Sequence, residues 1–364
     1  MKKNLSAIEL KQIVAELQEL LGSKVSKIYQ PIKEEVYIQA HSASQGKKIL
    51  RIFVPRFMHL TEHKLASPQS PHGFCQSLRK WISNTRIAKI KQTRMERIVE
   101  ITFESNAGNY ILIIELFARG NIILCREDMT IISALETQKF KDREIRPKAI
   151  YTAPKAAFDL TKFKIDDIKE ALEKTKSDNI VKFLAIDLGL GGLYAEEIIE
   201  NCNINKNKTS LEPKEMEQVY KGILKLLERK PEPMIVTKEG FSDVVPFELA
   251  AYRDYEKKGF KSFNEALDEY NYSNLTEQKS KEASPERERL EKILRAQEEV
   301  IKQGEAEIAE NQRKGEMIYE HYQEIKDILE RVNSELKKLT KEEIIEKHKI
   351  KELDLKDKTI TVEL

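Results

Sequence analysis

The stretch from Arg79 to Arg97 holds seven basic side chains and a single acidic one, Glu96. Lysine and arginine contact phosphate oxygens, and a tryptophan among them, Trp81, could stack on an unpaired base. A helix and a strand that face RNA would need these residue types. The alternative is a solvated helix face, and for Trp81 itself we expect a place in the core. The basic residues are Arg79, Lys80, Arg86, Lys89, Lys91, Arg94 and Arg97.

A second candidate is the glycine-rich turn Leu188–Leu193, which connects two expected helices. Its glycines, Gly189, Gly191 and Gly192, would expose backbone N–H groups at a helix N-terminus. Such a terminus favours an anion of the size of phosphate. Glycine-rich connections between helices also occur for steric reasons alone, so the turn by itself does not establish an anion site.

Motifs for enzymatic chemistry are missing. The sequence has no Gly-Lys-Ser/Thr phosphate loop, no Gly-x-Gly-x-x-Gly after a strand, no His-Glu-x-x-His and no Gly-x-Ser-x-Gly. His59 and His63 have the spacing of a helical metal site, but Pro55 and Pro68 bracket them, so we expect solvated loop histidines. The three scattered cysteines fit neither a disulfide framework nor a four-ligand zinc site. We therefore expect a binding protein without catalytic residues, metal or cofactor.

The net charge of +2 hides a strong asymmetry. Residues 1–155 carry 26 Lys+Arg against 15 Asp+Glu, and the rest of the chain carries 37 against 46. Counterion release favours nucleic acid on the basic part only, although segregation of charge by chance is the alternative. The sequence also lacks the ~18 to 20 apolar residues of a membrane span and the apolar core of a signal peptide. We expect a cytoplasmic protein that binds no membrane.

Residues 1–157 are expected to form an α+β domain. Apolar residues at spacings of three and four predict a helix over 6–22, with Ser6 as the N-cap. Polar turns between short alternating runs predict an antiparallel meander in the second half. The expected strands are 36–40, 49–54, 98–103, 110–117 and 121–125, and a second helix is expected over 72–84.

Four further segments follow. Residues 158–230 should be helical, and 231–283 should form a mixed connector. The pattern then predicts a coiled-coil helix over 284–340, and a tip with a strand over 341–364. The boundary at 284 rests on the proline at the next position, after which no further proline occurs.

An apolar stripe over 318–339 needs a partner. A lone coiled-coil helix suggests the front part of a longer protein, in which a returning helix of the same chain would cover this stripe. For the present chain we expect pairing in a homodimer. The alternative is that residues 341–364 fold back and cover the stripe within one chain.

Seven segments resemble the NFACT family in the same order along the chain. This family comprises the eukaryotic nuclear export mediator factor, a yeast ribosome quality-control subunit, and the bacterial and archaeal proteins once called fibronectin-binding protein A. The segments are Leu5–Leu10, Lys27–Gln30, Met95–Val99, Ala118–Leu124, Leu188–Glu197, Val244–Leu249 and Ser262–Tyr270.

The resemblance implies an RNA-binding factor of ribosome-associated quality control. Such a factor binds the large ribosomal subunit that carries stalled peptidyl-tRNA, and recruits aminoacyl-tRNA for template-free C-terminal tailing. Its expected partners are the large subunit, tRNA and ribosomal RNA. The implied fold is a first domain like the N-domain of formamidopyrimidine-DNA glycosylases, a helix-hairpin-helix domain and a coiled coil.

The resemblance also places functional residues. Its acid–arginine pair falls on Glu96 and Arg97 and its N-terminal acid on Glu9, where many members have aspartate. Arg119, in the matching segment Ala118–Leu124, joins the expected RNA contacts. Because adjacent strand residues point to opposite faces, only one of Glu96 and Arg97 should face RNA unless the strand begins with a turn or bulge here.

Two other function classes compete with this interpretation. A nucleic-acid-processing enzyme related to the glycosylases would need an N-terminal proline amine, but position 2 is Lys2. A fibronectin-binding surface adhesin would need a signal peptide or an anchor, which the sequence does not offer. We therefore expect a factor that is not an enzyme.

Overall fold

The computed structural model describes residues 2–42, 46–63, 70–154, 158–160 and 162–362, without the side chains of 274–291. The chain divides into two compact units, Met1–Thr276 and Glu277–Leu364. Within the described residues, no helix is both long and apolar enough to cross a membrane.

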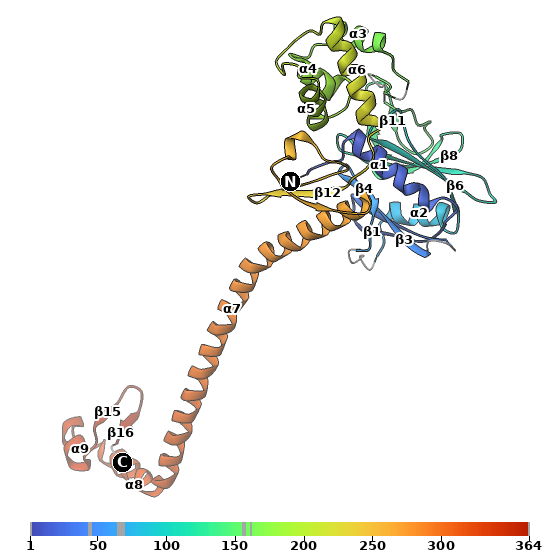
Figure 1. Cartoon of the computed structure of the whole chain (residues 1–364). Coiled ribbons are helices and arrows are strands. Elements are labelled where there is room, and N and C mark those ends of the chain that lie inside the picture. Colours follow the sequence, from blue (N-terminus) through green and yellow to red (C-terminus); the bar gives the residue numbers. More distant parts are fainter. Residues whose placement is uncertain (1, 43–45, 64–69, 155–157, 161, 363–364) are drawn as a thin grey trace. The chain divides into compact units, whose positions relative to one another are not determined.

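A nine-stranded antiparallel sheet forms the centre of the first unit (Figure 1), in the order β4-β3-β2-β1-β5-β6-β7-β8-β9. The predicted α+β class and the predicted meander are thereby confirmed. Four strands, β1, β4, β5 and β9, lie outside the predicted strand ranges. Strand β1 shows no simple alternation of apolar and polar residues. The strands are β1 (Lys24–Ile32), β2 (Glu35–Ser42), β3 (Gly46–Phe53), β4 (Phe57–Leu60), β5 (Arg86–Gln92), β6 (Ile98–Glu104), β7 (Tyr110–Glu115), β8 (Asn121–Arg126) and β9 (Ile131–Ala134).

Helices α1 (Ala7–Glu16) and α2 (Gly73–Ile82) share one hydrophobic core with the sheet. Ser6 caps α1, because its hydroxyl accepts from the Glu9 amide while the Glu9 carboxylate accepts from the Ser6 amide. The α-helix ends at Glu16 and continues as the 3₁₀ turn η1 (Leu17–Leu20), so it is shorter than the predicted helix over 6–22. On the opposite face, a smaller apolar cluster joins β6–β9 to the short strand β11 (Glu144–Ile145), which pairs with β10 (Gln138–Lys139).

A second core holds the helical segment together. It contains side chains of α3, α5 and α6 together with the short helix α4 and the π-helical turn η2. A three-stranded sheet in the order β13-β12-β14 follows in the chain. The elements are α3 (Ile165–Lys174), α4 (Ile180–Lys182), η2 (Phe183–Asp187), α5 (Gly192–Asn201), α6 (Pro213–Leu227), β12 (Met234–Lys238), β13 (Phe241–Val245), the 3₁₀ turn η3 (Ala250–Tyr252) and β14 (Glu256–Gly259).

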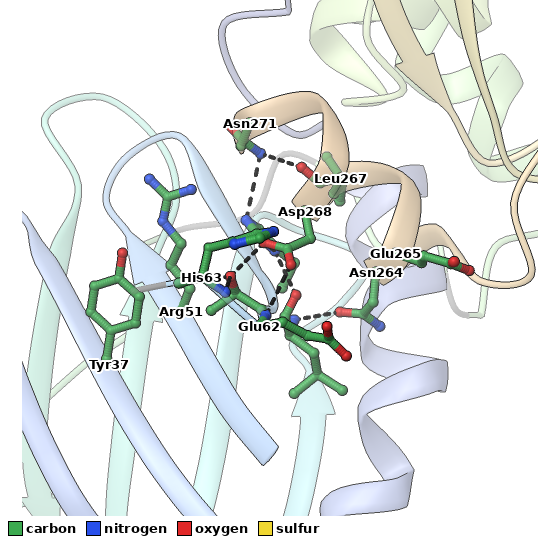
Figure 2. Close-up of polar contacts among 12 residues, drawn as sticks. Tyr37, Arg51, Glu62, His63, Asn264, Glu265, Leu267, Asp268 and Asn271 are labelled. Carbon is green, nitrogen blue, oxygen red and sulfur yellow. Dashed lines mark hydrogen bonds and ion pairs between the residues drawn. The ribbon is translucent and has the colours of Figure 1, made fainter. Parts of the chain in front are cut away.

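The long helix α7 (Phe263–Glu320) begins well before the predicted boundary at 284, so that boundary is wrong. Its first turns pack on the edge strand β4, and their polar side chains occupy the edge (Figure 2). The Leu60 amide donates to Asn264 Oδ1 at 2.7 Å, and the Glu62 amide donates to Asp268 Oδ2 at 2.9 Å. These contacts cover backbone groups that an open sheet edge would expose. The buried face of these turns, which the proline criterion overlooked, consists of Phe263, Ala266, Leu267 and Tyr270.

The second unit ends in a small folded tip. Helix α7 stops at Glu320 and α8 (Tyr322–Glu335) starts after a break at His321, so the single helix predicted over 284–340 is interrupted. Helix α9 (Lys341–His348) and the hairpin of β15 (Glu352–Asp354) and β16 (Thr359–Thr361) bury Val332 of α8, which is 3% exposed. Residues 341–362 thus cover part of the stripe within one chain.

Candidate nucleic-acid interface

The loop between β5 and β6 has a strained backbone. Arg94 and Met95 are consecutive non-glycine residues with φ of 51° and 58°, in the left-handed region. Each such residue costs of order 1–3 kcal/mol and persists only where its surroundings hold it. The Glu96 amide donates to the Thr93 carbonyl at 2.8 Å, and the Gln92 side chain donates to the carbonyls of Ala7 and Glu96, each at 2.8 Å. The loop is therefore fixed from both sides.

A pocket of about 250 Å³ opens beside this loop. One wall is the loop itself, with Arg94, Glu96 and Arg97, and the facing wall is Ile186–Gly189 of the helical segment. Phe117, Pro154, Phe158 and Leu160 contribute apolar surface. Glu96 and Arg97 line the same pocket because both precede β6, which begins only at Ile98. Both residues thus lie in a turn before the strand, which is the case in which the sequence allowed both Glu96 and Arg97 to face RNA.

Two of the charged residues that line this pocket, Glu96 and Arg97, are half-buried and unpaired. In the described part of the chain, neither the Glu96 carboxylate nor the Arg97 guanidinium has an ion-pair or hydrogen-bond partner. Burial raises the pKa of Glu96 against the opposing charge of Arg94, and burial lowers the pKa of Arg97. Partly desolvated charges without partners are unfavourable in the free protein, so this pocket is suited to a ligand that supplies those partners.

Glu9 lies in the interior instead of facing solvent. It is 1% exposed. Its carboxylate accepts a hydrogen bond from the Tyr194 hydroxyl at 2.9 Å and forms an ion pair with the Lys2 ammonium at 2.6 Å. The other carboxylate oxygen accepts from the Ser6 amide at 2.8 Å. A direct contact of Glu9 with RNA would require these bonds to break. In this conformation Glu9 joins α1 to α5, and the expected RNA contact is not available.

Lys2 extends this buried cluster to the three-stranded sheet. Its ammonium also lies 3.2 Å from Asp243 Oδ1, while Asp243 Oδ2 accepts from the Tyr252 hydroxyl at 2.6 Å. Burial alone would lower the pKa of Lys2, but Glu9 and Asp243 outweigh it and raise that pKa. The buried cluster of Lys2, Glu9, Tyr194, Asp243 and Tyr252 therefore holds a permanent positive charge between two carboxylates.

Of the glycines in the turn Leu188–Leu193, one lines the pocket. Gly189 (φ 72°) lines the pocket wall, whereas Gly191 and Gly192 do not line it. Gly191 (φ 84°) packs on the N-cap of α1, since a Cβ there would lie 3.7 Å from the Ser6 Cβ. The structure thus brings Gly189 to Arg97 and uses Gly191 to join α5 to α1.

The basic side chains of β5 lie on one face of the sheet. Arg86, Lys89 and Lys91 pair in register with every second residue of β6. The sequence count overlooked their neighbours on that strand: Glu100 forms an ion pair with Lys91 at 2.8 Å, and Glu104 is the register partner of Arg86.

The remaining predicted contacts are scattered. The Arg79 guanidinium donates to the Ile28 carbonyl at 2.7 Å, and the Lys80 ammonium lies 5.3 Å from the centre of the Trp81 ring. Trp81 packs partly buried against the core, as expected. Arg94 lines the pocket, whereas Arg119 is exposed in the turn before β8 and does not line it. Within the described residues, no group of three or more potential ligands could hold a metal ion.

Sequence reasoning missed Lys2, Gln92, Tyr194 and Asp243. Gln92 fixes the loop, and the other three anchor Glu9. No local pattern marks them, because their partners lie up to 241 residues away in the chain.

Comparison with known proteins identifies relatives over most of the chain. An archaeal Rqc2 homolog, aRqcH, from Methanocaldococcus jannaschii is 32% identical over 93% of this chain and 53% of its own length. A ribosome quality control complex subunit, the NEMF homolog of Drosophila melanogaster, is 26% identical over 80% of this chain and 36% of its own length. The chain thus spans about half or less of these relatives.

Solved structures show a similar fold. The N-terminal part of the fibronectin/fibrinogen-binding protein from Streptococcus suis aligns with a TM-score of 0.60 and 22% identity, over 74% of this chain and 100% of that one. At this identity the likeness concerns the fold alone. The family described as NFACT N-terminal and middle domains matches residues 6–364. On this match, which covers nearly the whole sequence, the chain belongs to the NFACT family.

Proposed function

We propose that this chain is the tRNA-binding part of a ribosome quality-control factor. The factor would bind the large ribosomal subunit that carries stalled peptidyl-tRNA, and recruit aminoacyl-tRNA for template-free C-terminal tailing. The observation that carries the proposal is the pocket in which Arg97 and Glu96 are unpaired and face Gly189. The names of the relatives, which refer to ribosome quality control, support the setting.

The chemistry of the pocket suits one unstacked nucleotide. Arginine binds phosphate or a base edge through its planar set of donors, and a carboxylate accepts hydrogen bonds from base N–H groups. The apolar wall of Phe117, Phe158 and Leu160 offers a surface for the face of a base. Single-stranded loops of tRNA present bases of this kind, whereas a duplex does not. The proposal therefore assigns Arg97 and Glu96 to a loop nucleotide of tRNA.

The finer fold assignments belong to the same proposal. Helices α3–α6 with the turn at Gly189–Gly192 would form the helix-hairpin-helix domain, and α7 with α8 the coiled-coil arm. The first domain would be the glycosylase-like N-domain, and the factor would act in the cytoplasm. We infer that it is not a glycosylase, because the residue that follows Met1 is Lys2 and not the proline whose amine that chemistry needs.

A photo-crosslinking experiment tests the pocket. Ile186 lines it and is 69% exposed, so a benzoylphenylalanine placed there should crosslink to tRNA under ultraviolet light. The same probe at Phe241, which is 39% exposed on the β12–β13 hairpin and away from the pocket, is the control. Crosslinks of equal yield at both positions, or at Phe241 alone, would contradict the proposed site.

We also propose that two copies pair through α7. Leu294, Ile301 and Ile308 are spaced by seven and are 56%, 60% and 65% exposed, so they form one uncovered stripe. Covering such a stripe is favourable by about 1.5 to 3 kcal/mol for each fully buried side chain. Light scattering at tens of micromolar should therefore give twice the chain mass of 42.3 kDa.

Two matched double variants test this pairing, one with glutamates in the apolar stripe of α7 and one with glutamates elsewhere on the same helix. Ile301→Glu with Ile308→Glu should give a monomer, whereas Gln303→Glu with Gln312→Glu, outside the stripe, should leave the dimer intact. A monomeric unmodified chain at the same concentration would rule the pairing out.

A further inference from the structure

A row of basic side chains crosses the sheet at right angles to its strands. Lys47 on β3 is the register partner of His41 on β2, His41 is the partner of Lys24 on β1, and Lys24 is the partner of Arg86 on β5. Neighbouring strands lie about 4.8 Å apart, so four basic residues stand side by side across four strands. We call these four residues the transverse row.

The transverse row lies on the face opposite to α1 and α2. Val25, Ala40 and Ile87 each follow or precede a member of the row, and all three are buried in the core shared with these helices. Successive strand residues point to opposite faces, so the row points away from the helices. Consistently, Lys48 next to Lys47 pairs with Glu19 at 3.5 Å, just after α1. All four members of the row are exposed.

Like charges in this arrangement repel one another. Directly opposed like charges on neighbouring strands destabilise a sheet, and Lys24 faces Arg86 in this way. Within the described residues, the ammonium groups of Lys24 and Lys47 have no ion-pair or hydrogen-bond partner. Arg86 donates to the Gly22 carbonyl at 3.0 Å, and the row ends at Glu104 on β6. A bound polyanion would supply the missing counter-charge.

The transverse row connects to the pocket along β5. Arg86, Lys89 and Lys91 lie on the same face of the sheet. A bulge between Ile87 and Lys89 shifts the register by one residue, so the three basic residues pair with alternate residues of β6, which are Glu104, Thr102 and Glu100. Strand β5 then runs directly into the loop that carries Arg94 and Arg97. Basic side chains therefore follow one path from Lys47 to the pocket.

We propose that the transverse row binds the phosphodiester backbone of the tRNA whose loop nucleotide enters the pocket. This rests on the proposed function, and it adds a second contact made by Lys24, His41 and Lys47. Lysine side chains bind phosphate as point charges and read no base, so the contact is independent of sequence. It raises affinity and salt dependence, while the pocket supplies the specific contact.

The test compares two double variants in binding to purified tRNA over a range of salt concentrations. Lys24→Gln with Lys47→Gln should weaken binding by roughly tenfold, and should reduce the slope of log affinity against log salt by about 1.4 to 1.8, for two lost phosphate contacts. The Tm should stay equal or rise, because repulsion within the row is relieved. Lys230→Gln with Lys261→Gln removes the same charge from exposed positions outside the row and should change neither affinity nor slope.

The other outcomes separate the two proposals. If the unmodified chain binds tRNA and the row variant keeps its affinity and slope, the row is not a tRNA contact and the pocket proposal stands. If the row variant loses binding to the large subunit but not to tRNA, the row contacts ribosomal RNA and the inference is wrong. If the unmodified chain does not bind tRNA, the proposed function fails and the inference falls with it.

Discussion

Arg97→Ala should lower the affinity for tRNA by at least about tenfold and abolish tailing by the intact factor. A hydrogen bond to a charged group contributes about 1.5–3 kcal/mol, and no other described side chain pairs with this guanidinium. The Tm should move by only a few degrees, because the substitution breaks no ion pair in the free protein. Fluorescence anisotropy with labelled tRNA, together with thermal denaturation, measures both quantities.

Two further variants sharpen this prediction. Arg97→Lys keeps the charge but loses the planar set of donors, so it should recover part of the affinity. Arg253→Ala, an exposed arginine that does not line the pocket, should bind tRNA normally. Full tRNA affinity in Arg97→Ala would show that the pocket is not the tRNA site, and a large fall in Tm would assign Arg97 a structural role.

Glu9→Ala should reduce the free energy of unfolding by about 3–5 kcal/mol. Removing one partner of a buried ion pair leaves the other charge uncompensated, here the Lys2 ammonium. The Tyr194 hydroxyl loses its acceptor at the same time. Urea denaturation at neutral pH measures the loss. Glu19→Ala is the control, because Glu19 pairs with Lys48 at 3.5 Å near the surface and should matter by less than about 1 kcal/mol.

The pH dependence of stability provides an independent check on the buried cluster. The pKa of Lys2 is raised in the folded state above its ordinary 10.5. The stability that Lys2 contributes is therefore fully present below the unfolded-state pKa and is lost as the pH rises through the folded-state pKa. Glu9→Ala should weaken this alkaline loss. Unchanged stability with lost tRNA binding would instead make Glu9 a direct RNA contact.

Local patterns predicted the parts of the fold that local contacts determine. The meander of β6–β8 follows from alternating residues and polar turns, and the start of α1 follows from Ser6 and Glu9 as a capping box. The true start of α7 escaped prediction because Phe263 and Leu267 are buried by a sheet formed much earlier in the chain. A proline in the sequence was a weaker boundary signal than this distant packing.

The candidate site was predicted only in part for the same reason. Residue types identified Arg97 and Gly189 separately, but the pocket that joins them depends on packing between segments about 90 residues apart. The family resemblance placed an RNA contact at Glu9, but in the structure this side chain is buried and bonded to Lys2 and Tyr194. The transverse row could not be predicted from the sequence, because strand register and not sequence spacing places Lys24 between His41 and Arg86.

A cryo-electron microscopy reconstruction of the protein with tRNA on its own large ribosomal subunit would show which part of the protein holds the tRNA. We expect a tRNA loop nucleotide in the pocket, with Arg97 and Glu96 in contact with it and Gly189 on the facing wall. A tRNA held elsewhere on the protein, with this pocket empty, would contradict the proposed tRNA site.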